Sequence, residues 1–155
     1  MTMQGFPNLL RIKDSIDAVP VAQSRFFIVD EHCPAGERKQ VFSVAGRGRV
    51  DLIVEIQTSK NDDQMMFEPQ FDGQSELWCP QFVHDWLQLE AIAGQQSPIY
   101  THVWNEVGNE FGIVFALPRY FSDSFELWLD NRDVGSEHVV KYLLILYSKY
   151  PAVLP

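Results

Sequence analysis

Acidic and apolar side chains alternate along residues 125–130, and this alternation is the clearest candidate for a binding surface. We predict a strand at residues 124–130, and successive side chains of a β-strand point to opposite faces of the sheet. If Phe125 and the two leucines of this segment face the core, Trp128 lies outward between Glu126 and Asp130. Tryptophan is enriched among the residues that dominate interface energies, and flanking carboxylates select a basic partner. We therefore predict Glu126, Trp128 and Asp130 as an anchor for a basic protein; the alternative is that a helix buries Trp128.

A block of negative charge accompanies this anchor in the sequence. Residues 61–118 contain nine carboxylates and neither lysine nor arginine. Extended to residue 131, the block holds twelve carboxylates and one arginine, a net charge of −11 in a chain whose formal net charge is −9. Such a field attracts basic proteins and repels nucleic acid and anionic lipid. We predict that four further carboxylates steer the partner toward the anchor: Asp62, Asp63, Glu106 and Glu110.

A second candidate site is an aromatic pocket on a predicted hairpin. Gly108-Asn109 is typical of a two-residue turn, which here would join strands at 99–107 and 110–117. In that register one sheet face collects Tyr100, His102, Trp104 and Phe115. A histidine among aromatic rings can serve as a base or ligand for a small molecule. A core histidine with satisfied ring nitrogens gives the same pattern.

The other chemistry-bearing residues form no recognised motif. His32, Cys33, Cys79 and His84 are ligand types suited to zinc, but adjacent ligands seldom reach one metal and no paired-cysteine knuckle is present. The chain contains no nucleophile elbow and no phosphate-binding or dinucleotide motif. We expect no metal, no cofactor and no catalytic residue, and therefore a protein that is not an enzyme.

Composition indicates a cytoplasmic protein. The two cysteines are too few for a disulfide framework, which is typical of a reducing compartment. No apolar run approaches the roughly 18 residues that span a bilayer. The N-terminal residues lack the basic-then-apolar order of a secretory signal. We expect no direct contact with a membrane or with nucleic acid.

The first half of the chain is predicted to be mainly strand. Residues 24–30 and 65–69 have the β-branched and aromatic content of strands, and 40–45 with 49–57 predict a hairpin across Gly46-Arg47-Gly48. Alternation in the second arm of this hairpin predicts four side chains inward and two outward. The inward residues are Val50, Leu52, Val54 and Ile56, and the outward ones are Asp51 and Glu55.

Helices are predicted at three places. The first runs from Asn8 to Val19 and ends at Pro20, and the second runs from Pro80 to Gly94. Residues 136–150 predict a last helix, capped by Ser136. This last segment is apolar over most of its circumference, so it is either a deeply buried helix or a strand.

The sum is a single α+β domain over residues 1–155, a largely antiparallel sheet of about five to seven strands with two or three helices. Small acidic α+β proteins are a common form of immunity protein, which is a similarity of type that rests on no motif. The leading hypothesis is a binding module that neutralises or chaperones a basic partner, such as a nuclease-like toxin. The alternatives are a small-ligand binder or enzyme around His102, and a subunit of a larger assembly that makes contact through residues 136–150.

Overall fold

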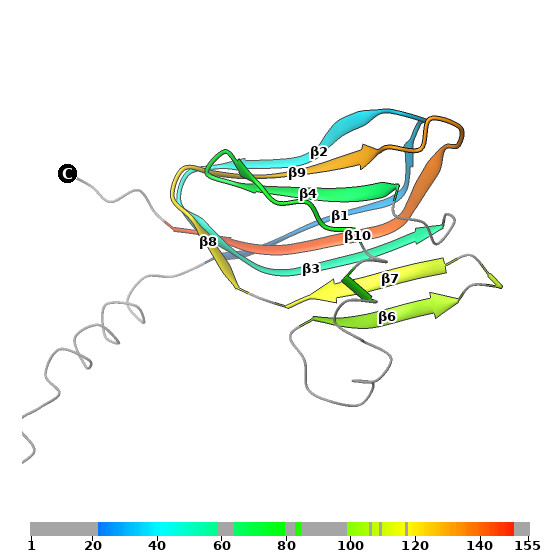
Figure 1. Ribbon diagram of the computed structural model, residues 1–155. Coiled ribbons are helices and arrows are strands. Elements are labelled where there is room, and N and C mark those ends of the chain that lie inside the picture. The colour runs from blue at the N-terminus through cyan, green and yellow to red at the C-terminus, as the bar shows by residue number, and fades with distance from the viewer. Residues whose placement is uncertain are drawn as a thin grey trace, which may run out of the picture.

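The computed structural model describes residues 22–58, 64–79, 83–84, 99–105, 107–108, 110–116 and 118–150 (Figure 1). Every complete element in these ranges is a β-strand, and helical geometry among them is limited to residues 83 and 84. The strands are β1 (Ala22–Cys33), β2 (Arg38–Ala45), β3 (Gly48–Thr58), β4 (Met65–Phe71), β5 (Gln74–Ser75), β6 (Ile99–Asn105), β7 (Glu110–Phe115), β8 (Arg119–Phe121), β9 (Ser124–Asn131) and β10 (His138–Lys149). The predicted α+β class is therefore wrong, because the described residues form two antiparallel sheets.

The strands are divided between two sheets. Sheet A has the order β1-β10-β3-β7-β6, with β8 paired to the first residues of β3, and sheet B has the order β2-β9-β4-β5. Figure 1 shows β2, β9 and β4 stacked above β10, β3, β7 and β6, so the two sheets form a sandwich. All pairings in both sheets are antiparallel.

The pairing is nested, as in a long hairpin folded over on itself. The first strand pairs with the last (β1 with β10), the second with the next to last (β2 with β9), and β4 with β5 lies at the innermost position. Between these, β3 pairs with β7 and β8. Without β6 and β8, this order is that of an eight-strand jelly roll. The topology explains why strands close in sequence, such as β2 and β3, belong to different sheets.

The core lies between the sheets and is built from their inward-facing apolar residues. Sheet B contributes Phe42, Val44, Phe67, Phe125, Leu127 and Leu129, and sheet A contributes Val50, Ile53, Ile113, Val140, Leu143 and Ile145. A row of rings runs through the centre, with centroid separations of 4.7 Å for Phe26–Phe42, 5.8 Å for Phe42–Phe125 and 4.8 Å for Phe71–Phe125. Offset and tilted aromatic pairs at these distances add to the energy of burial.

Several predicted strands are confirmed, but their pairing is not. Segments 24–30, 65–69 and 124–130 lie within β1, β4 and β9. The two arms of the predicted hairpin around Gly46-Arg47-Gly48 are β2 and β3, yet they pair with β9 and β10 and not with each other. The connection between them crosses from one sheet to the other, which a local turn signal does not distinguish from a hairpin.

The predicted last helix is wrong, and its strand alternative is correct. Residues 138–149 form β10, which lies between β1 and β3 in sheet A. Its run Val-Val-Lys-Tyr-Leu-Leu-Ile-Leu-Tyr places apolar side chains on both faces of a strand. The same run would give a helix that is apolar on all sides, so the sequence alone does not distinguish the two structures. The helices predicted over 8–19 and 80–94 lie outside the described residues, apart from residues 83 and 84.

The predicted two-residue turn at Gly108-Asn109 is also wrong. Asn105 pairs with Glu110, so four residues connect β6 to β7. The amide of Gly108 donates a 2.9 Å hydrogen bond to the Asn105 side chain, which closes this longer turn. The register predicted from a two-residue turn is displaced as a result.

Polar side chains tie the loops together at both ends of the sandwich. The Asn131 side chain, which is fully buried, donates to the carbonyls of Cys33, Pro34 and Ser136 at 2.9–3.0 Å. The Asp72 carboxylate accepts the backbone amides of residues 122–124, and these bonds lower its pKa. Each clamp links segments that are far apart in sequence and fixes how β9 enters and leaves sheet B.

Candidate functional site

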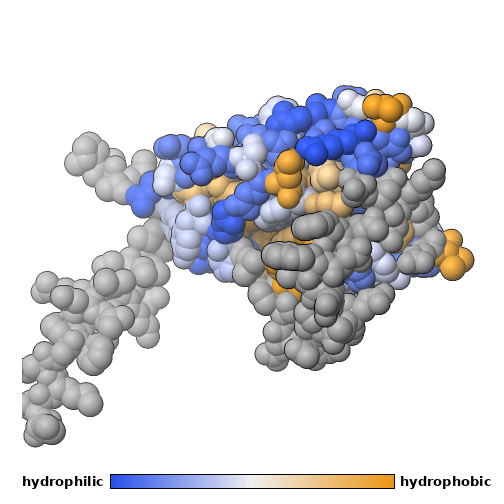
Figure 2. All heavy atoms as spheres, viewed as in Figure 1, coloured by the Kyte–Doolittle hydropathy of each residue, from blue (hydrophilic) through white to orange (hydrophobic). Residues whose placement is uncertain are grey.

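The outer face of sheet B presents the predicted anchor. Phe125, Leu127 and Leu129 are completely buried, as predicted, so their neighbours point outward from β9. Trp128 lies opposite Gln40 of β2 on one side and Glu68 of β4 on the other. Hydrophilic residues cover the side of the molecule formed by sheet B (Figure 2). No helix covers this face among the described residues, and Trp128 is half-buried by neighbouring side chains.

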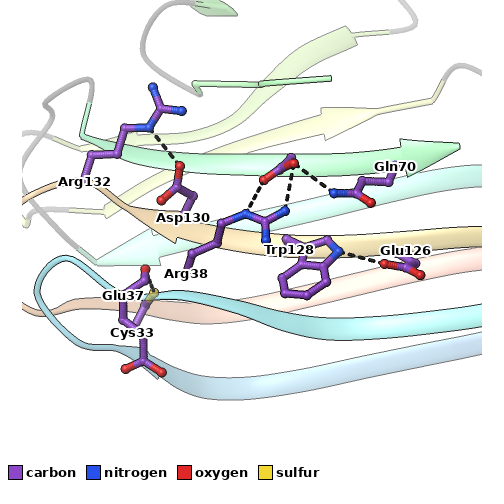
Figure 3. A network of polar contacts seen from close by, with 9 residues as sticks. Cys33, Glu37, Arg38, Gln70, Glu126, Trp128, Asp130 and Arg132 are labelled. Atoms are coloured by element: carbon purple, nitrogen blue, oxygen red, sulfur yellow. Dashed lines mark hydrogen bonds and ion pairs between the residues drawn. The ribbon is translucent and has the colours of Figure 1, made fainter. Parts of the chain in front are cut away.

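The Trp128 network is the set of polar contacts around this ring (Figure 3). It comprises Arg38, Glu68, Gln70, Glu126, Trp128, Asp130 and Arg132. The Arg38 guanidinium forms two hydrogen bonds with the Glu68 carboxylate, at 2.7 and 2.9 Å, and its central carbon lies 4.1 Å from the centre of the Trp128 ring. The indole nitrogen donates to Glu126 at 2.9 Å. A paired fork of this kind that also stacks on tryptophan is a strong and directional contact.

Every carboxylate in the Trp128 network has a partner within the protein. Arg38 lowers the pKa of Glu68 to about 2, chiefly by hydrogen bonding. Asp130 pairs with Arg132 at 2.8 Å, and Glu126 accepts the indole N–H. Three carboxylates thus face two guanidinium groups. The negative field at this face is weaker than the sequence charge indicates, because the two guanidinium groups offset most of the carboxylate charge. A basic partner would also have to compete with these existing contacts.

The predicted steering residues are not gathered around the anchor. Glu110 begins β7 in sheet A and forms an ion pair with Lys141 of β10. It therefore belongs to the other sheet from Glu126, Trp128 and Asp130. Asp62, Asp63 and Glu106 lie outside the described residues. The structure brings together the three anchor residues but does not place Glu110 with them.

The four residues of the predicted aromatic pocket do not share a face. A bulge between Thr101 and Val103 leaves His102 without a partner in β7, and both His102 and Tyr100 are exposed. Phe115 instead faces Ile99, and Trp104 faces Phe111 on the inner side of sheet A. The bulge reverses the side-chain alternation of β6 at its midpoint, and this separates the histidine from the rings.

His84 occupies the place that His102 was predicted to hold. It is buried, its ring lies parallel to Trp104 at a centroid distance of 3.8 Å, and its Nδ1 forms a 2.8 Å hydrogen bond with the Thr101 hydroxyl. Thr101 lies opposite Ile113, which faces the core. The sequence shows His84 only as part of an uncertain helix, so no local pattern indicates this contact.

Glu55 and Gln57 are buried on the inner face of β3, in contrast to the prediction that Glu55 faces solvent. Glu55 lies between Leu143 and Ile113 and is 1% exposed. Neither carboxyl oxygen has a hydrogen-bond partner in the described part of the chain, and the same holds for the Gln57 side-chain oxygen. Burial raises the pKa of Glu55 well above its ordinary value of 4.5, because desolvation favours the neutral acid. A neutral acid sealed from solvent has no substrate to protonate, and we assign it no catalytic role.

The physical cause of this reversal is a bulge at Asp51. Val50 pairs with Tyr147 and Leu52 pairs with Leu146, so Asp51 is one residue more than β10 can match. Its carboxylate is held by Arg49 and by the Ser148 hydroxyl. Because side chains alternate strictly along a strand, one extra residue exchanges the two faces beyond it. Val50 is inward as predicted, whereas the alternation after Asp51 is inverted.

The inverted alternation of β3 adds three residues to an apolar outer face of sheet A. We define the apolar face as eight outward side chains on three adjacent strands: Phe27 and Val29 of β1, Tyr142, Leu144 and Leu146 of β10, and Leu52, Val54 and Ile56 of β3. Phe27 and Val29 are 61% and 54% exposed. A groove on this face is lined by Arg25, Phe27, Tyr142, Leu144 and Leu146. Two features of the sequence could have indicated this apolar face: the continuous apolar run of β10 and the alternating apolar residues of β3.

The cysteines and the remaining histidines do not converge. Cys33 and Cys79 are both buried, and burial raises the pKa of Cys33. His32 is exposed beside Glu137, on the opposite side of its strand from Cys33. In the described ranges, no group of three or more His, Cys, Asp or Glu side chains is arranged to hold a metal ion.

A scan against protein-family models finds no match, and a search of curated proteins finds none either. The described residues include no helix with the length and hydrophobicity needed to cross a membrane.

Replacing Arg38 with methionine should destabilise the fold, because Glu68 would remain 7% exposed without its guanidinium. We expect the free energy of unfolding at pH 7 to fall by about 1–3 kcal/mol. Glu68 has a lowered pKa in the folded state, so its contribution is present above pH 4.5 and is lost as the pH falls toward 2. Urea unfolding of wild type and variant from pH 7 to pH 2 should therefore show a difference that shrinks with acidity.

The matched control for this prediction is Arg132→Met. The two arginine side chains are similarly exposed, but Asp130 is more exposed than Glu68 (18% against 9% of the side chain), so the Arg132–Asp130 pair should contribute about 0.5 kcal/mol or less. Equal losses for the two variants would show that Arg38 has no special role at this face.

Replacing Glu55 with glutamine should remove a pH dependence from stability. The folded protein keeps Glu55 protonated, while the unfolded chain releases the proton above about pH 4.5. Stability of the wild type should fall as the pH rises from there toward the raised pKa of Glu55, by at most about 1.4 kcal/mol per pH unit. Glu55→Gln should be more stable than wild type at pH 7 and equal to it near pH 4. Urea unfolding at several pH values measures this, and Glu37→Gln, an exposed carboxylate, should keep the wild-type slope.

Proposed function

We propose that this chain is a non-enzymatic protein-binding module and that the apolar face of sheet A is its contact surface. One observation carries the proposal: three adjacent strands direct eight apolar side chains outward, and two of these are more than half exposed. Contiguous apolar patches are uncommon on monomeric soluble proteins and are typical of sites that bind another protein.

The sequence of β10 supports the same proposal. Leu143 and Ile145 face sheet B and are completely buried, whereas Leu144 and Leu146 point to the other side. Strands with apolar residues on both faces are typical of sheets that are covered on both sides. Sheet B covers one side, and the described residues provide no cover for the other. A partner that binds there would complete the second layer.

This proposal joins two of the functions that the sequence predicts. It keeps the prediction of a binding protein, and it gives residues 136–150 the role of a contact, though as a strand and not as a helix. A reducing, cytoplasmic location is part of the proposal and is supported by the small number of cysteines, since two are too few for a disulfide framework.

A second candidate function is the predicted capture of a basic protein at Glu126, Trp128 and Asp130. The observation that favours it is the outward position of all three on β9, with the Trp128 ring already stacked against a guanidinium. A cation from a partner could bind the indole and carboxylates in the same manner as Arg38. A nuclease-like toxin remains the proposed class of target, because a phosphate-binding surface is cationic.

Phe27→Glu should abolish binding at the apolar face without unfolding the protein. Phe27 is exposed on an edge strand, so the charge costs little in the free protein but is buried when a partner docks. We expect partners recovered from native cytosol on immobilised protein to fall by about tenfold. Val134→Glu is the control, since Val134 is an isolated exposed residue (87%) in a loop, and recovery should be unchanged. Equal recovery with both variants and with wild type would contradict the proposed surface.

Reversing both anchor acids, Glu126→Lys with Asp130→Lys, should slow association with a basic partner and flatten its salt dependence. Association rates at low and high salt measure this, with exposed Asp123→Lys as the control for net charge. Identical rates for wild type and the double variant would remove the anchor from this candidate function.

A further inference from the structure

The apolar face has the size of one helix. With Arg25 added, its side chains form three rows across β1, β10 and β3. In register the rows are Arg25, Leu146 and Leu52; Phe27, Leu144 and Val54; and Val29, Tyr142 and Ile56. Strands lie about 4.8 Å apart and alternate residues about 6.6 Å apart, so the outer Cα positions of the grid span about 10 by 13 Å. An α-helix is about 10–12 Å across and rises about 5.4 Å per turn. Two to three helical turns laid along β10 would cover all three rows.

A second copy of the chain fits this face less well. Stable interfaces engage about 20–30 residues on each side, and the three rows supply nine. A face of this size is adequate for a short amphipathic segment, which needs one stripe of apolar anchors at helical spacing. The partner is therefore better described as a helix than as another sandwich.

Arg25 adds a charge requirement to the groove. It is exposed, it lines the groove beside Phe27 and Leu146, and it forms no ion pair with any described residue. Lys141, which precedes Tyr142 of this face on β10, is by contrast paired with Glu110. A ligand with a carboxylate next to its apolar stripe would satisfy Arg25, whereas a lysine there would be repelled.

We propose that the partner of the apolar face is an amphipathic helix of another protein that carries a carboxylate at the edge of its apolar stripe, where it meets Arg25. This inference rests on the proposed function and names the chemistry of its partner. It also separates the two surfaces of the molecule, because a basic ligand suits the Trp128 network and an acidic helix suits the apolar face.

The test uses two synthetic helical peptides and the full chain. Both peptides have leucines at positions i, i+3, i+4 and i+7, and one has glutamate beside the stripe where the other has lysine. Fluorescence anisotropy should show that wild type binds the glutamate peptide about fivefold more tightly than the lysine peptide. Arg25→Glu should reverse this preference. Arg47→Glu makes the same charge change at an exposed residue outside the groove, and it should leave the wild-type preference intact.

Three outcomes would overturn the inference. The first is that neither peptide binds, or that Arg25→Glu leaves their ratio unchanged. The second is a dimer in sedimentation that Phe27→Glu dissociates, since a second copy would then occupy the face. The third is tighter peptide binding after Ile12→Asp with Ile16→Asp, which would assign the face to the chain's own N-terminal segment. Loss of cytosolic partners in Phe27→Glu without any peptide binding would leave the proposed function standing and refute the helix alone.

Discussion

One extra residue in β3 determines which side chains of this central strand of sheet A face the core. Asp51 bulges out of the β3–β10 pairing and is held there by Arg49 and Ser148. Beyond the bulge, Ile53 packs into the core, and the following alternate residues, Glu55 and Gln57, must enter with it. A strand cannot turn single side chains independently, because its alternation is fixed by the backbone. The position of this bulge therefore sets which residues β3 contributes to each face of the sheet.

The two faces that result are unusual in opposite ways. The inner one accepts a neutral carboxylic acid with no partner among the described residues, which costs folding free energy. The outer one carries apolar rows across β1, β10 and β3, in which Phe27 and Val29 of β1 are exposed and the residues of β10 and β3 are half-buried. A register that is unfavourable for the isolated sandwich becomes reasonable if a partner covers the outer rows, since their burial would offset the cost of Glu55. The free energy of binding a partner would then contribute to the stability of the fold.

The electrostatic field of this molecule depends more on which carboxylates are paired with arginine than on the number of acidic residues. The acidic block predicts an attractive field for a basic protein, but the folded sheet places Arg38 against Glu68 and Arg132 against Asp130. Arg38 comes from β2, far outside the acidic block in sequence, and reaches Glu68 because both β2 and β4 flank β9. The groove on the apolar face, in turn, is lined by Arg25, which forms no ion pair with any described residue. Long-range strand order thus creates two surfaces with different preferences in one acidic chain.

The sequence by itself determined the strands around residues 24–30, 65–69 and 124–130, the burial of Phe125, Leu127 and Leu129, and the alternation that puts Trp128 on the opposite side of its strand, but it left open whether a helix buries Trp128. These properties depend on local alternation and side-chain type, which a strand shows directly. Only the tertiary structure decided that 138–149 is a strand, that β2 and β3 join different sheets, and that Glu55 and His84 are buried while His102 is exposed. The reason is that bulges at Asp51 and His102 and the nested strand order are set by partners distant in sequence, and a single unmatched residue exchanges the faces of everything that follows it.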